Sequence, residues 1–183
     1  MDDRFFTAYF PGDATVCGRK LQSFTAFHYL LLKAVGSPFL SADGVIDSAD
    51  LLVAIKVCRN SFGQPVNLKP SLRDAVWKLR MTGNPALFRR ECRKFASWMA
   101  MHSSGPRFWD VVSGGQKSRD LTGPDILTLI TPMMMKTTLT ESEAWNMSLG
   151  RAQWINAEIC EMEGSERRFL YDSDLEDEEE SDA

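Results

Sequence analysis

The segment SADLLVAIKVCRN, residues 48–60, places apolar side chains around almost the whole circumference of a helix. Only Lys56 and Arg59 leave a narrow polar strip on it. A helix that is apolar all round packs at the centre of a fold rather than at its surface. Ser48 is a suitable N-cap residue for this helix. We therefore expect residues 48–60 to form part of the hydrophobic core.

The neighbouring segments add further helices to this centre. Residues 25–35 are apolar nearly all round, with Ser23 as a plausible N-cap and Gly36 as the terminator. We expect this helix and the one at 48–60 to form the core pair. Residues 71–81 predict a short third helix, and an asparagine–proline pair opens a fourth that runs to about residue 102.

Composition limits the class of protein. The chain has 183 residues, of which 44% are apolar and 25% charged, as expected for one soluble domain with its own core. No apolar run approaches the roughly 18 residues of a membrane-spanning helix, and the N-terminus does not resemble a signal peptide. The four cysteines are far apart, with no CxxC pair and only two histidines. We expect a cytosolic protein without a membrane segment, a metal site or a cofactor.

The chain divides by composition into four segments. We expect an extended or β N-terminal segment (1–22), a helical core domain (23–139), a C-terminal helical arm (140–170) and a disordered acidic tail (171–183). The first segment mixes aromatic residues with proline and glycine, which favours short strands over helix. The predicted fold class is therefore mainly α: a single-domain bundle of five to seven helices.

Charge is distributed unevenly along the chain. Residues 172–182 hold eight acids and no base, which leaves 17 acids (25 − 8) against 21 bases, or +4, on residues 1–171. Arg89, Arg90, Arg93 and Lys94 form a basic face on the fourth helix, which is most simply a solvated surface. A body charge of +4 argues against nucleic-acid binding. An alternative is that the acidic tail docks on this basic face.

Catalytic motifs are lacking in the sequence. SGGQKS, residues 113–118, has glutamine before its lysine and so departs from a phosphate-binding loop. His28 lies in an apolar helix with no orienting partner in view. Asp43, Asp47 and Asp50 fit capping roles at a turn and a helix start. We expect the protein not to be an enzyme.

The arm TESEAWNMSLGRAQWINAEICEMEG, residues 140–164, opens with a capping box of Thr140 and Glu143. Trp145 and Trp154 are nine positions apart, so on one straight helix they would face opposite sides. A break near Gly150 would let both point inward. In the preceding apolar helix, residues 124–136, we expect Pro132 to introduce a kink or break.

Methionines gather beside this arm. Met-rich surfaces adapt to varied apolar helices, although methionine equally often fills gaps in a helical core. The candidate partner-binding residues are Met133, Met134, Met135, Trp145, Met147 and Trp154.

Three stretches of the chain are notable together: VCGRKLQSFTAFHYLLLKAVGSPFL (16–40), DLLVAIKVCRNSF (50–62) and the arm at 140–164. They resemble the tail assembly chaperones of tailed bacteriophages. The resemblance implies a mostly helical protein that coats the phage tape measure protein, keeping it soluble until tail tube subunits polymerise around it. It further implies action in the host cell cytoplasm, absence from the mature virion, possible homo-oligomers on the client and possible extension by a ribosomal frameshift.

Three other functions remain open on the sequence. The chain could be a virion structural protein, such as a tail completion or connector component. It could be an acidic host-directed inhibitor that imitates nucleic acid through its tail. An enzyme of uncharacterised type would need a polar pocket that the sequence does not reveal.

Overall fold

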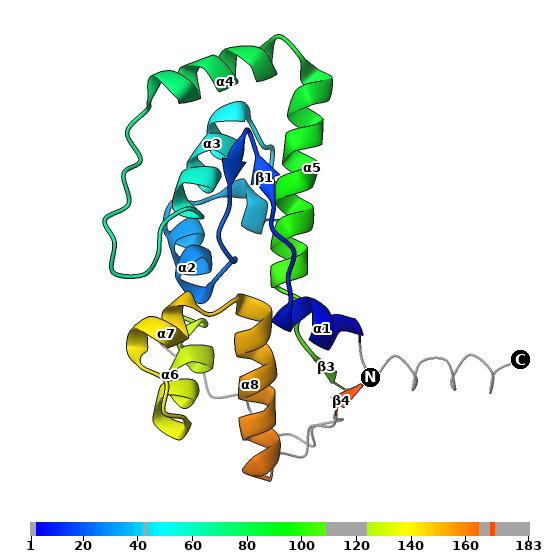
Figure 1. Ribbon diagram of the computed structural model, residues 1–183, viewed down its shortest axis with the longest axis vertical. Helices are drawn as coiled ribbons and strands as arrows, with labels where there is room; N and C mark the ends of the chain where they lie inside the picture. The colour runs from blue at the N-terminus through cyan, green and yellow to red at the C-terminus, as the bar shows by residue number, and fades with distance from the viewer. Residues whose placement is uncertain (1–2, 42–43, 109–123, 165–168, 171–183) are drawn as a thin grey trace, which may run out of the picture.

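The computed structural model describes residues 3–41, 44–108, 124–164 and 169–170, and within these ranges it is mainly helical (Figure 1), which confirms the predicted mainly α class. These ranges contain eight α-helices, more than the five to seven expected. The helices are α1 (Asp3–Tyr9), α2 (Ala26–Ala34), α3 (Ser48–Val57), α4 (Leu72–Thr82), α5 (Pro85–His102), α6 (Leu127–Lys136), α7 (Glu141–Asn146) and α8 (Leu149–Met162), with a 3-10 turn at Pro38–Leu40. Strands β1 (Thr15–Val16) and β2 (Arg19–Lys20) form one antiparallel pair, and β3 (Arg107–Phe108) and β4 (Phe169–Leu170) form another.

The predicted core pair lies at the centre of the upper part of the molecule. Helices α2 and α3 pack together beside the long α5, and α4 lies across the top (Figure 1). Leu51 and Ile55 of α3 are fully buried, as are Leu32 of α2 and Phe95 of α5. Below them, α6 and α8 pack against each other, and α1 packs against both α5 and α8. The main hydrophobic cluster joins side chains from both parts, so the fold has a continuous core.

The N-terminal segment differs from its prediction. Residues 3–9 form the helix α1, although an extended segment was expected over 1–22. Phe5 and Tyr9, one helical turn apart, stack on each other with ring centroids 4.3 Å apart, and Phe5 also packs edge-on against Trp154. Tertiary packing of this aromatic pair therefore outweighs the local signals of proline and glycine. The expected strand character is confirmed further along, in the β1–β2 hairpin.

Two helix caps are each displaced from the predicted residue. Asp47, rather than Ser48, caps α3, and its carboxylate accepts from the backbone N–H groups of Ala49 and Asp50. Thr25, rather than Ser23, caps α2 in a reciprocal capping box with His28. Both shifts keep the same chemistry, because a side-chain oxygen still satisfies free N–H groups in the first turn.

The C-terminal helices partly match their prediction. Helix α6 continues through Pro132 to Lys136 rather than breaking there. The capping box of Thr140 and Glu143 is confirmed at the start of α7. The arm divides at residues 147–148, and Gly150 lies in the first turn of α8 instead of at the break. A Cβ atom at Gly150 would lie 2.7 Å from the backbone oxygen of Ser104, so glycine permits close packing of α8 on the segment after α5.

A buried ionic cluster holds α4 on the rest of the fold. Asp74, on the inner face of α4, pairs with Arg19 of β2 and with Lys56 of α3. It also accepts from the backbone N–H and the hydroxyl of Ser71, the N-cap residue. Burial opposes ionisation of Asp74, but these hydrogen bonds outweigh it and hold its pKa well below the usual value. The cluster joins α4 to two elements that are distant from it in sequence.

Candidate protein-binding surfaces

The structure buries three of the six residues that the sequence predicted to contact a partner. Met133 is fully buried, and Trp145 and Trp154 are 7% and 8% exposed. Met134 and Met147 are half-buried, and Met135 alone of the six is well exposed, at 75%. The six residues therefore do not form one exposed surface, and their role in partner binding stays a prediction.

The physical reason is the break between α7 and α8. It turns both tryptophans inward, so that Trp145 stacks parallel to Phe62 at 5.5 Å while Trp154 packs against α1. Met133 packs with Ala152 and Ile159 of α8. The alternative role of these methionines, filling gaps in a helical core, applies to Met133.

A groove opens where Trp154 approaches the surface. It has a volume of about 490 Å³ and lies between α1, the C-terminal end of α6 and α8. We call it the α1/α8 groove. Its apolar walls come from Phe5, Tyr9, Trp154, Ile155, Ile159 and Met162, and its polar rim from Lys136, Thr137, Glu158 and Glu163.

The walls of the α1/α8 groove are held in place by specific contacts. The indole N–H of Trp154 donates to the backbone oxygen of Ser104 at 3.2 Å, which orients the ring. The guanidinium of Arg151 lies over the ring of Tyr9, 5.1 Å from its centroid. Met162, by contrast, is 82% exposed at the end of α8. The groove therefore combines fixed aromatic walls with one flexible, solvent-exposed apolar side chain.

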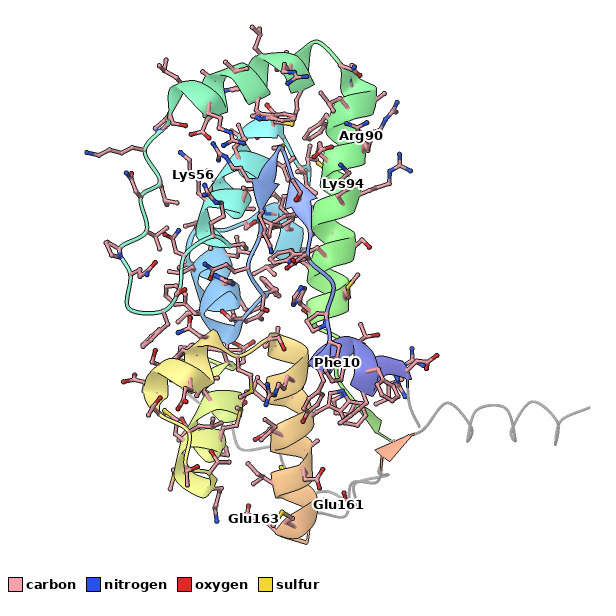
Figure 2. The ribbon with its side chains drawn as sticks, viewed as in Figure 1. Phe10, Lys56, Arg90, Lys94, Glu161 and Glu163 are labelled. Atoms are coloured by element: carbon pink, nitrogen blue, oxygen red, sulfur yellow. The ribbon has the colours of Figure 1, made fainter. Side chains whose placement is uncertain are left out.

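The rim of the groove carries two acids, Glu158 and Glu163, and one base, Lys136, which leaves one net negative charge. After Arg151, α8 and the residue that follows it carry three exposed acids and no base, namely Glu158, Glu161 and Glu163. Lys136 of α6 pairs with Glu163. Figure 2 shows Glu161 and Glu163 on either side of the lower end of α8. A ligand with apolar side chains and positive charge at its edges would complement this rim.

A second apolar surface lies on α4. Leu72, Val76 and Leu79 are 90%, 55% and 76% exposed, and they follow one another at the i, i+4, i+7 spacing of a single helix face. The opposite face carries the buried Asp74 and Met81. We call the three exposed residues the α4 stripe.

The basic face on α5 is partly neutralised. Arg90 and Lys94 both pair with Glu91, which is almost fully buried and also accepts the backbone N–H of Cys17 at 2.7 Å. Arg89 and Arg93 are exposed, and Figure 2 shows Arg90 and Lys94 projecting from α5. The acidic tail that was predicted to dock here, residues 171–183, lies outside the described residues.

His28, Cys17 and Cys58 are titratable groups that the fold buries. The ring of His28 accepts from the Thr25 N–H through Nδ1, and its Nε2 lies 2.6 Å from the carbonyl oxygen of Asn60. Burial raises the pKa of the Cys17 thiol to about 12 and also raises that of Cys58, which keeps both thiols protonated at neutral pH. No cluster of three or more His, Cys, Asp or Glu side chains in the described ranges could hold a metal ion. SGGQKS lies outside the described residues.

Two of these features were missed by reasoning from the sequence. Phe5 and Tyr9 show the i, i+4 spacing of a helical pair, but the nearby glycine and proline were given more weight. The spacing of Leu72, Val76 and Leu79 was also visible in the sequence, but a helix with this pattern is normally expected to turn its apolar side inward.

Among the described helices, none is long and apolar enough to cross a membrane.

Comparison with known proteins gives no relative for this chain. A scan against protein-family models finds no match, and searches of curated proteins and of solved structures likewise find none.

Proposed function

We propose that this chain is a non-enzymatic tail assembly chaperone that binds the tape measure protein of a tailed bacteriophage. In this role it keeps the client soluble in the host cytoplasm while the tail tube assembles. The client identity rests on the resemblance of residues 16–40, 50–62 and 140–164 to this family. The binding role rests on the α1/α8 groove, which is the single observation that carries it.

The groove suits an apolar helical segment rather than a folded domain. Its volume of about 490 Å³ lies within the range of clefts that enclose small ligands, roughly 300–1,000 Å³, so it can take a few side chains of one helix. A helix in a groove is recognised through apolar anchors at i, i+3 or i+4, and i+7. The acids at the rim favour anchors that are flanked by lysine or arginine.

The matched pair of exposed methionines provides a test. Met162 lines the groove, whereas Met135 is similarly exposed but lies outside it. We expect Met162→Gln to weaken binding of a tape measure fragment about tenfold, a change of roughly 1.4 kcal/mol, and Met135→Gln to leave it unchanged. Both variants should unfold at the wild-type temperature, because neither side chain is buried. Binding is measured by calorimetry with purified, full-length chain.

Co-expression tests the chaperone role itself. The tape measure protein should be soluble when expressed with the chain and should precipitate when expressed alone. A tape measure protein that stays soluble without the chain would contradict the proposal. So would stoichiometric amounts of the chain in purified virions, which would instead indicate a structural component. Equal effects of Met162→Gln and Met135→Gln would remove the groove as the binding site.

A further inference from the structure

The α4 stripe is a rigid surface rather than a loosely packed helix. Asp74 fixes the inner face of α4 through its pairs with Arg19 and Lys56, and Met81 is buried on the same face. Arg73 adds a hydrogen bond to the backbone oxygen of Gly18 at 2.5 Å. With 3.6 residues per turn, the three stripe residues fall within about 60° of one another, roughly opposite Asp74. The stripe is therefore presented on a helix that needs no ordering upon binding.

The exposed charges of α4 are all positive. Arg73, Lys78 and Arg80 are exposed on α4, and the single acid of this helix, Asp74, is buried in its ionic cluster. Arg73 and Arg80 lie on the edge of the helix next to Val76, about one turn before it and one turn after it. A partner on the stripe must therefore supply apolar side chains in the middle and negative charge at the side.

From this arrangement we propose that α4 is a docking site for an amphipathic helix of another protein, with acids flanking an apolar i, i+3 or i+4, i+7 pattern. Such a helix lies along α4, and its apolar side chains fill the spaces between Leu72, Val76 and Leu79. Its carboxylates pair with Arg80. This site goes beyond the proposed function, because it lies at the opposite end of the molecule from α8 (Figure 1) and can be occupied at the same time as the α1/α8 groove.

Three other occupants fit the stripe less well. A second α4 would bring like charges together at the edges. The chain's own acidic tail, residues 172–182, contains one large apolar residue, Leu175, against the three on the stripe. A membrane surface favours exposed aromatic anchors, whereas Trp77 is half-buried beneath the guanidinium of Arg80, 4.9 Å from the ring centroid.

The test is a selection from a displayed library of helical peptides on the immobilised full-length chain. Binders that also bind the Leu72→Gln, Leu79→Gln double variant are removed. We expect the remaining peptides to share apolar residues at i, i+3 or i+4, and i+7 with aspartate or glutamate beside them. The best of these, as a synthetic peptide, should bind Leu79→Gln at least about tenfold more weakly than wild type. Val45→Ser, at an equally exposed valine outside α4, should bind it normally.

Charge provides the second measurement. Arg80→Glu should weaken the same acidic peptide, and rising salt should weaken its binding to the wild type but less so to Arg80→Glu. The proposal is overturned if the selected peptides are basic or lack helical spacing, or if none is recovered. It is also overturned if the chain self-associates through Leu79 in sedimentation, or binds phosphatidylcholine–phosphatidylglycerol vesicles through it. Met162→Gln should leave this peptide's affinity unchanged, so failure here is distinguishable from failure of the α1/α8 groove.

Discussion

Replacing Asp74 by asparagine tests the ionic cluster that fixes α4. The change preserves the size of the side chain but removes the negative charge that faces Arg19 and Lys56. The side chains of Asp74 and Arg19 are 6% and 4% exposed, so water cannot replace the lost partner. Among the described residues, Nε and Nη1 of Arg19 already lack a hydrogen-bond partner. The Arg19 guanidinium therefore has no other hydrogen bond that would compensate for the loss of the Asp74 carboxylate.

The size of the effect follows from burial. Removing one partner of a buried ion pair costs about 3–5 kcal/mol, because the other charge stays buried without compensation. For a chain of this length, that cost lowers the unfolding temperature by roughly 6–20 °C. The pair of Asp13 and Lys20 provides the control, with side chains 74% and 69% exposed. Asp13→Asn should cost less than about 1 kcal/mol.

The pH dependence gives an independent check of the same group. The pKa of Asp74 in the folded protein is held below its unfolded value of about 3.9. Its contribution to stability is therefore fully present above that unfolded value and is lost as the pH falls through the folded pKa. The gap in unfolding free energy between wild type and Asp74→Asn should be constant near neutrality and narrow in strong acid.

Urea unfolding followed by circular dichroism measures both the loss of unfolding free energy and its dependence on pH. For Asp74→Asn the urea concentration at the midpoint should fall. The slope of the unfolding free energy against urea concentration should stay the same, since the surface exposed on unfolding does not change. A loss no larger than that of Asp13→Asn would refute the view that this cluster holds α4 in place. A large loss that persisted unchanged in strong acid would show that the charge of Asp74 is not the cause.

Three other substitutions or conditions test the packing of the core. Gly150→Ala should destabilise the fold by about 1–3 kcal/mol in thermal unfolding, because the added methyl group would meet a backbone oxygen 2.7 Å away. Burial lowers the pKa of both His28 and His102, so stability should fall as the pH drops below about 6.5, as urea titrations would reveal. Met133→Ala should cost about 2–5 kcal/mol and Met135→Ala within about 0.5, by the same assay.

Each of these three predictions has a result that would contradict it. Gly83→Ala is the control for Gly150, because its added methyl group would meet only ordinary contacts at 3.5 Å and its backbone is helical. A neutral Gly150→Ala would mean that α8 can move away from Ser104. Stability that is flat between pH 7 and pH 5 would rule out the depressed histidine pKa values. Equal costs at Met133 and Met135 would contradict their different burial.

The fold was predictable where the signals are local. Helix α3 follows from its continuous apolar residues, α5 from the Asn84–Pro85 start, and α7 from the capping box of Thr140 and Glu143. Each of these depends on residues within one or two turns, so neighbouring sequence contains the cause. The caps of α2 and α3 were misplaced by one or two residues, because serine, threonine and aspartate compete closely for that position.

The candidate site was not predictable in the same way. The groove exists because Phe5 packs on Trp154, and these residues are separated by nearly the whole chain. On α5, Cys92 and Met99 lie at apolar helical spacing but are half-buried, whereas Glu91 and Trp98 are buried. Reasoning from the sequence places a glutamate at the surface because its side chain is charged. The burial of Glu91 is compensated by Arg90 and Lys94 and by the backbone N–H of Cys17, and a helical pattern cannot reveal this last partner.

The contrast between the two faces of α4 argues for a binding role more strongly than exposure alone. Stability is served when apolar residues face inward and charges face water, because burying a charge is costly even when it is paired. Helix α4 places Asp74 inside, beside the apolar Met81, and Leu72, Val76 and Leu79 outside. A helix selected only for stability would gain from polar residues in place of these three. The arrangement is instead consistent with a helix that is anchored by polar contacts so that its apolar side remains available to a partner.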